Sequence, residues 1–126
     1  MDDDEKQQVL YHGTTLDVAQ TILAQRSFEC RPTYFAINRN LAVLFANRSS
    51  AKRSHAVAPA IVRVSMYASD FQQLRRGGRA QFRGFDEGDR PELRGQTQII
   101  LDSEGIRLLN RDMFADEMTI EPANGA

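Results

Sequence analysis

The sequence predicts a single α+β domain, and three observations support this. The length of 126 residues suits one compact domain. Strand-like segments alternate with two amphipathic segments in the first half of the chain, whereas strand patterns dominate the second half. The hydrophobic fraction of 41% and the charged fraction of 26% are typical of a globular protein. This order of elements is typical of an α+β fold rather than an alternating α/β fold.

Five segments are predicted to be strands because they are apolar, β-branched or alternating. They lie at residues 9–12, 33–36, 60–67, 96–101 and 118–120. Two segments have helical periodicity. The first runs from residue 16 to about residue 26, and the second can be capped by Asn38 and carries an apolar stripe at residues 41–45. The polar, basic segment 49–59 is expected to be a flexible connection.

Three segments are expected to lie outside the regular elements. Residues 1–8 are predicted to be an acidic flexible tail and residues 122–126 a second tail, on either side of a domain at 9–121. Residues 75–95 contain five glycines and six arginines, which predicts a long mobile loop. Loops of this length inside a compact domain are usually functional or disordered.

Composition and charge exclude several classes of protein. The 16 Lys and Arg residues against 17 Asp and Glu residues give a net charge of −1, which argues against a general nucleic-acid binder. No apolar stretch approaches the roughly 20 residues needed to span a bilayer, and the acidic N-terminus is unlike a signal peptide. We therefore expect a cytoplasmic protein with no membrane partner. One cysteine and two histidines exclude a disulfide scaffold and a zinc module, so no metal is expected.

Two segments in the first half of the chain could bind a flat, polar ligand. In one, His12 ends a strand at Gly13 and is followed by Thr14, and a turn glycine lets the backbone approach a ligand closely. In the other, Tyr34 on a strand and Phe45 on the helix behind it could sandwich a planar ring. Taken alone, these segments are explained better by an exposed turn and by two core aromatic residues.

A third segment lies at the head of the apolar strand at residues 96–101. Alternation places Gln96 and Gln98 on the same face of that strand. Glutamines are common on exposed strands, so this pair alone indicates little. The order and spacing of all three segments are what indicate a functional site.

Together, the three segments resemble those of the ADP-ribosyltransferase superfamily, in the branch of the poly(ADP-ribose) polymerases and diphtheria-like toxins. That branch has a histidine in an HG-[ST] turn, a tyrosine in a YFA-like strand before a helix, and a glutamate in a later strand. The matching segments here are Leu10-Tyr11-His12-Gly13-Thr14, Tyr34-Phe35-Ala36 with the helix at 41–46, and Thr97-Gln98-Ile99-Ile100-Leu101. The resemblance implies a single-domain split β-sandwich with short helices.

The resemblance also implies a function. A member of this family would cleave NAD, its substrate, between nicotinamide and ribose, and transfer ADP-ribose to a macromolecule, most simply a protein. A chain this small is similar to a bacterial or phage effector, toxin or defence enzyme, acting in the cytoplasm, or in the host cytosol if it is secreted. An antitoxin or an activating factor is a candidate partner, and polymer elongation is not expected.

The resemblance assigns roles to individual residues. His12 and Thr14 would hold the adenosine-side ribose of NAD, and the backbone of Gly13 would bind the nicotinamide carboxamide. Tyr34 and Phe45 would stack on the nicotinamide ring. His12 and Tyr34, with Gln98, would form the catalytic set.

Gln98 departs from the family because it stands where a glutamate is expected. Its amide oxygen can accept a hydrogen bond from the 2′-hydroxyl of the reacting ribose, but it carries no charge. Loss of a preorganised electrostatic contact in the transition state typically costs about 3–4 kcal/mol. Two functions therefore stay open: an active mono-ADP-ribosyltransferase, and a catalytically silent module that binds NAD, ADP-ribose or a protein. It also stays open whether the glutamine is native or an introduced replacement.

Four further residues are expected on the acceptor side of the site. Gln96 lies two positions before Gln98, where related transferases place a residue that orients the acceptor. Arg83, Asp86 and Glu87 lie in the arginine-rich segment, where the family has its target-recognition loop. The two acids could also supply the charge that Gln98 lacks. Two alternatives stay open: the segment is only a solvated connection, or its arginines bind the NAD pyrophosphate or an acidic patch of the target.

Overall fold

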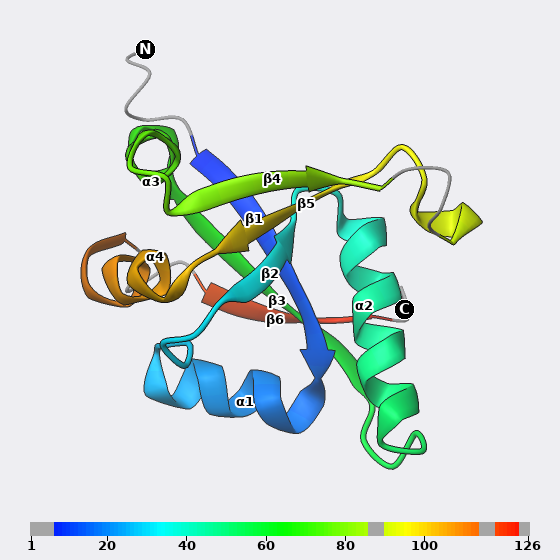
Figure 1. Cartoon of the computed structure of the whole chain (residues 1–126). Helices are drawn as coiled ribbons and strands as arrows, with labels where there is room; N and C mark the ends of the chain where they lie inside the picture. Colours follow the sequence, from blue (N-terminus) through cyan, green and yellow to red (C-terminus); the bar gives the residue numbers. More distant parts are fainter. Residues whose placement is uncertain (1–6, 86–89, 114–117, 124–126) are drawn as a thin grey trace.

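Six antiparallel strands form one sheet in the computed structural model, which describes residues 7–85, 90–113 and 118–123 (Figure 1). The strands are β1 (Gln7–Thr15), β2 (Thr33–Ala36), β3 (Pro59–Tyr67), β4 (Ala80–Gly84), β5 (Thr97–Leu101) and β6 (Met118–Pro122). Over the same residues, the four α-helices are α1 (Leu16–Gln25), α2 (Arg39–Lys52), α3 (Ala68–Arg76) and α4 (Ser103–Leu108). The predicted α+β class in one small domain is therefore confirmed.

The sheet consists of two three-stranded halves that meet at β1 and β2. The strand order is β4-β5-β2-β1-β3-β6. β1 pairs with β3 along its whole length, from Gln7↔Tyr67 to Thr15↔Pro59, but it pairs with β2 only at Tyr11↔Ala36. Beyond that pair the two strands separate, so the sheet is open on the side where β1 ends (Figure 1).

Helices cover both faces of the sheet, each over its own hydrophobic cluster. One cluster combines buried side chains of the sheet with side chains from α1, α3 and α4. Its members include Leu10, Phe35, Val62, Ile99, Ile22, Phe71, Leu74 and Ile106. The other cluster lies under α2, where Leu41, Ala42 and Ala46 pack against Ala36 and Ile61. Burying one large apolar side chain stabilises a fold by roughly 1.5–3 kcal/mol, so both clusters contribute to holding the two halves together.

α2 lies directly on β1 because Gly13 has no side chain. A Cβ atom at this position would lie 2.1 Å from the carbonyl oxygen of Ala42 and 2.7 Å from the backbone nitrogen of Ala46. Gly13 pairs with Ile61 inside β1, and it is not among the glycines with positive φ. The predicted turn at this glycine is therefore wrong, and the residue is needed for space rather than for a turn.

Two predicted connections are partly regular structure. α2 continues to Lys52, so the first four residues of the predicted flexible segment 49–59 are helical; the buried Ser50 hydroxyl donates to the carbonyl of Val57 at 2.7 Å and fixes the turn that follows. The predicted loop at 75–95 contains the end of α3 and the whole of β4, which pairs with β5. Glycines and arginines on both sides obscure β4 in the sequence, but Phe82 stacks on Phe71 with ring centroids 6.1 Å apart.

The predicted tails are shorter than expected where the structure describes them. Gln7 and Gln8 belong to β1 and pair with Tyr67 and Met66. At the other end, β6 runs to Pro122, and the following residue, Ala123, is buried. Pairing with β3 explains both differences, because each segment adds to one edge of that strand, β1 on one side and β6 on the other.

The contact between α2 and β1 can be tested with Gly13→Ala. The added methyl group meets backbone atoms that cannot move independently, so we expect the free energy of unfolding to fall by about 1–3 kcal/mol or more in urea denaturation. Gly84→Ala is the matched control, because a Cβ there meets only the carbonyl of Gln96, at 3.9 Å. It should change stability by less than about 0.5 kcal/mol. Equal effects of the two substitutions would contradict the assigned contact.

Candidate functional site

A cavity of about 410 Å³ lies where the two halves of the sheet separate. It is lined by residues from β1, β2, α2, β4 and β5, which are far apart in the sequence. Six residues singled out from the sequence lie on it: His12, Gly13, Tyr34, Phe45, Arg83 and Gln98. The fold therefore brings the three sequence segments to one place.

A second cavity, of about 730 Å³, adjoins the first. The two share His12, Gly13, Tyr34, Ser49 and Lys52, so they form one elongated cleft. The second cavity continues past Thr14 over α1 and the segment that leads into β2. The cleft thus has one end at β4 and β5 and the other end at α1.

The side chain of His12 bridges the opening between β1 and β2. Its Nδ1 atom lies 2.8 Å from the carbonyl oxygen of Tyr34, in place of the backbone pairing that ends at Tyr11↔Ala36. The imidazole also contacts the rings of Phe28 and Phe35, with both centroid distances at 5.5 Å. These contacts hold the ring in one orientation at the centre of the cleft.

His12 is uncharged at neutral pH. Burial lowers the pKa of its imidazole below the ordinary value of 6.5, and the nearby charge of Arg31 acts in the same direction, although the bond to the carbonyl of Tyr34 opposes both. A carbonyl oxygen can only accept a hydrogen bond, so Nδ1 carries the proton and donates it. Nε2 is left with a free lone pair, which can accept a hydrogen bond from a ligand hydroxyl.

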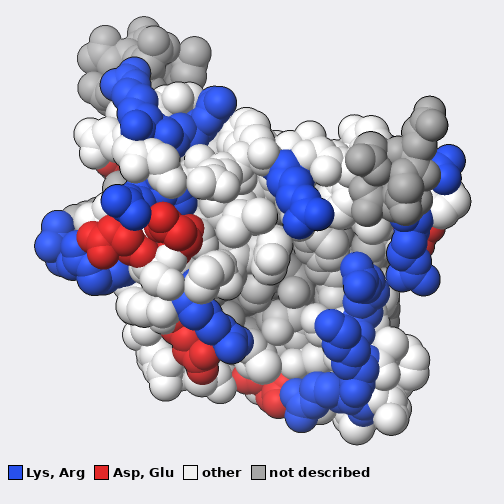
Figure 2. Space-filling view, viewed as in Figure 1, with Lys and Arg blue, Asp and Glu red and all other residues white. Residues whose placement is uncertain are grey.

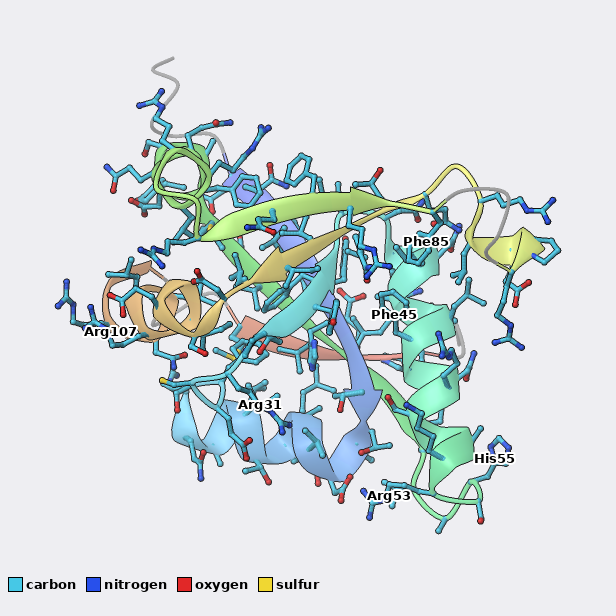
Figure 3. All side chains as sticks on the ribbon, viewed as in Figure 1. Arg31, Phe45, Arg53, His55, Phe85 and Arg107 are labelled. Carbon is cyan, nitrogen blue, oxygen red and sulfur yellow. The ribbon has the colours of Figure 1, made fainter. Side chains whose placement is uncertain are left out.

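Two aromatic side chains line the cavity, Tyr34 from β2 and Phe45 from α2. Tyr34 is 47% exposed although its neighbours Thr33 and Phe35 are buried, because alternation along β2 turns its ring away from the core. Phe45 projects from α2 and is half-buried against the cluster under that helix (Figure 3). The ring of Tyr34 is therefore available to a ligand, and the interpretation of this residue as a core aromatic is excluded.

Gln98 lies at the β5 side of the cavity and is only 5% exposed. It is directly opposite Ala36 on β2 and Arg83 on β4. Directly opposite residues in an antiparallel pair have Cβ atoms about 4.5–5.5 Å apart, so the side chains of Arg83 and Gln98 leave the sheet next to each other. No described residue makes a hydrogen bond to the side chain of Gln98, which leaves its amide free for a ligand.

No carboxylate is among the described residues that line the first cavity. Asp102 and Glu104, which follow β5, have other partners. Asp102 accepts from the backbone of Gly105 at 2.7 Å and pairs with Arg79 at 3.1 Å, and Glu104 pairs with Arg107. The described part of the site therefore lacks the negative charge that the resemblance leads one to expect at Gln98.

The remaining predicted residues divide into two groups. Gln96 is not on the cavity: its amide nitrogen donates to the carbonyl of Glu92 at 3.0 Å, and its buried Oε1 has no hydrogen-bond partner among the described residues. Gln96 precedes β5 rather than belonging to it, so alternation along this strand does not place its side chain beside that of Gln98. Asp86 and Glu87 lie outside the described residues.

Sequence reasoning missed four residues of the first cavity. They are Arg48, Ser49, Lys52 and Phe85. The first three extend the helical face of Phe45 at spacings of three, four and seven residues, a signal that was present in the sequence. The interpretation of residues 49–59 as a flexible connection concealed it.

An ion pair ties the two helices together at the outer end of the cleft. Arg53, just after α2, contacts the Asp17 carboxylate at 2.7 Å, and the Thr15 hydroxyl donates to the same carboxylate at 2.6 Å. The Thr15 bond, followed by the bond from Arg53, lowers the pKa of Asp17 to about 2. Figure 3 shows Arg53 at this end of α2, close to α1. Both partners are about half exposed, so the pair defines the edge of the cleft more than it stabilises the fold.

Comparisons with models of protein families, with curated proteins and with solved structures found no match to this chain. Across the described residues, no group of three or more His, Cys, Asp or Glu side chains is placed to hold a metal ion. In the same part of the chain, no helix is both long enough and apolar enough to cross a bilayer. The properties of the cleft are thus the basis for assigning a function.

The state of His12 can be tested by titration. Because its pKa is lowered in the folded protein, the unfolded chain binds more protons as the pH falls below about 6.5. The free energy of unfolding should therefore decrease over that range, and His12→Gln should reduce the decrease. Nitrogen NMR should also find the proton on Nδ1 at pH 7, and a proton on Nε2 would contradict the assignment.

Proposed function

We propose that this protein is a mono-ADP-ribosyltransferase that cleaves NAD in the cleft and transfers ADP-ribose to a macromolecule. One observation carries the proposal: His12, Tyr34 and Gln98, which match the family's three motif positions, line one cavity. The proposed fold is the family's split β-sandwich, and the separation of β1 from β2 beyond Tyr11↔Ala36 supports it.

The dimensions of the cleft suit a dinucleotide. The first cavity has a free aromatic face at Tyr34 and a second ring at Phe45, between which a nicotinamide ring can stack. The second cavity extends from His12 past Thr14, where the adenosine half would lie. The free lone pair on Nε2 of His12 suits a ribose hydroxyl, which would donate to it. A dinucleotide held at both ends has its glycosidic bond positioned for cleavage.

Gln98 is placed to bind the 2′-hydroxyl of the reacting ribose through its amide oxygen. Cleavage moves positive charge from the nicotinamide ring onto the ribose, and a neutral amide stabilises that charge less than a carboxylate does. We therefore expect NAD to bind well and to be cleaved slowly. Arg83 beside Gln98 would keep a carboxylate at this position ionised, so the site could accept the family's glutamate.

The second candidate function is a catalytically silent module that binds NAD, ADP-ribose or a protein. The absence of any carboxylate among the described lining residues of the first cavity favours it. Such a module would bind its ligand in the same cleft but would not cleave NAD. Nicotinamide release separates the two.

The binding site can be tested by calorimetric titration of NAD against Tyr34→Ala. Loss of one stacking face should weaken NAD binding by about 1–3 kcal/mol without unfolding the protein, because the ring is 47% exposed. Tyr67, which is 52% exposed at the end of β3, gives the matched control Tyr67→Ala. Equal NAD affinity in the two variants would place the ligand elsewhere.

The catalytic role of Gln98 can be tested with Gln98→Glu. The added charge should raise the rate of nicotinamide release by roughly 100–1,000-fold, while NAD affinity changes much less. Gln81→Glu makes the same chemical change at an exposed position of β4 and should not alter the rate. If Gln98→Glu releases no more nicotinamide than the unmodified protein, the transferase mechanism is wrong and the silent module is favoured.

A further inference from the structure

Asn110 ties the segment that leads into β2 to the end of α4. It lies in η3 (Leu109–Met113), a single π-helical turn that continues α4. Its Oδ1 atom accepts a hydrogen bond from the backbone nitrogen of Phe28 at 2.9 Å, and its Nδ2 atom donates to the carbonyl oxygen of Phe28 at 2.8 Å. An amide can make both bonds at once, whereas an ionised carboxylate cannot donate and an ammonium group cannot accept. The side chain of Asn110 therefore pairs with Phe28 as a neighbouring strand would.

Phe28 connects this pairing to the centre of the cleft. The residue is only 4% exposed, and its ring meets the imidazole of His12 edge-on with the centroids 5.5 Å apart. The same ring lies 5.3 Å from the ring of Phe35, which also contacts the imidazole. Aromatic rings at such distances prefer particular mutual orientations, so the position of Phe28 influences the orientation of His12.

Asn110 is itself held in place by the core. Leu109, beside it in η3, is fully buried in the same hydrophobic cluster as Phe28. The α1–β2 segment (residues 26–32) instead carries the exposed side chains of Glu29 and Arg31, which pair with each other at 3.3 Å. Figure 2 shows charged side chains at this rim, beside a hollow in the molecule, and Figure 3 shows Arg31 between α1 and β2. The two bonds from Asn110 thus join an exposed segment to a buried element.

We infer that Asn110 is a positioning residue for the cleft: by holding Phe28, it fixes the imidazole of His12 and one wall of the second cavity. On this side, the second cavity is lined by Ser27, Phe28, Glu29, Arg31 and Pro32. Asn110 is not among the described residues that line either cavity, so it acts through Phe28 rather than by touching a ligand. The role toward NAD rests on the proposed function, which places the adenosine half in the second cavity, whereas the role toward His12 rests on contacts within the chain.

Loss of the two bonds has a defined consequence for His12. Burial and the charge of Arg31 both lower the pKa of the imidazole, and both depend on where the α1–β2 segment lies. If Phe28 moves away, water reaches the ring and Arg31 is free to move with the segment. The pKa of His12 then rises toward its ordinary value of 6.5, and the proton is no longer confined to Nδ1.

The role toward His12 can be tested by NMR without any ligand. In Asn110→Ala and in Asn110→Leu, which keeps most of the side-chain volume, we expect a raised pKa of His12 and a mixture of its two tautomers. Asn38→Ala is the matched control, because it removes a comparable bond, from the backbone nitrogen of Asn40 at 2.8 Å, at the start of α2. It should leave His12 unchanged. An unchanged His12 in both folded Asn110 variants, or a change in Asn110→Ala alone, would overturn the inference.

Hydrogen exchange tests the same contact in the unmodified protein, so the test does not depend on the folding of a variant. The amide hydrogen of Phe28 is bonded to Asn110, and we expect it to exchange as slowly as the paired amides of β1 and β3. Exchange at the rate of an exposed amide would mean that the segment opens freely, and would contradict a fixed position for Phe28.

Titration with NAD separates this inference from the proposed function. We expect Asn110→Ala to weaken NAD binding by roughly tenfold and Asn38→Ala to leave it unchanged. In Gln98→Glu protein, adding Asn110→Ala should lower nicotinamide release at saturating NAD much less, because the α1–β2 segment lies away from Gln98 and the bond that breaks. A changed His12 with equal NAD affinity would overturn the role toward NAD and leave the role toward His12. An unchanged His12 in a protein that still binds and cleaves NAD would overturn the positioning role while the transferase stands.

Discussion

The contact of α2 with the backbone of β1 at Gly13 determines the shape of the cleft. With no Cβ between them, the helix lies close enough to β1 for Ala42 and Ala46 to touch the strand. The face of α2 that follows, from Phe45 to Lys52, then forms one wall of the first cavity. A larger residue would move this wall away from Tyr34 and Gln98. Gly13 therefore shapes the ligand site through its packing against α2. The residue also lines the first cavity itself.

The other determinant of the site is the early end of the pairing between β1 and β2. A complete ladder would close the sheet and leave no room for a ligand between its halves. His12 occupies the opening and satisfies the carbonyl of Tyr34 with its ring. The same bond fixes the tautomer that presents a free lone pair to the cleft. The side chain of His12 thus replaces a backbone hydrogen bond between β1 and β2 and also supplies a polar group for ligand binding.

The sequence predicted the elements whose patterns are local and missed those that depend on distant partners. β3 and β5 are strongly β-branched or apolar, and α2 has a cap at Asn38, so all three were predicted close to their positions. β4 is recognisable only through its pairing with β5 and the stacking of Phe82 on Phe71. The resemblance of three segments to the family's motifs led to His12, Tyr34 and Gln98, which line one cavity. The cations on α2 were missed because the length of that helix is set by tertiary contacts, including the bond from Ser50 to Val57.

Alternation along β1 limits how this protein can change in length. His12 faces the cluster that contains Phe35, whereas the next residue, Gly13, faces α2. Insertion or deletion of one residue between Gln7 and Tyr11 would reverse these directions, if the pairing with β3 were kept. The imidazole would then meet the helix backbone, and the glycine would leave a gap in the core. Natural variation in this strand should therefore consist of substitutions, with changes in length confined to segments outside the sheet.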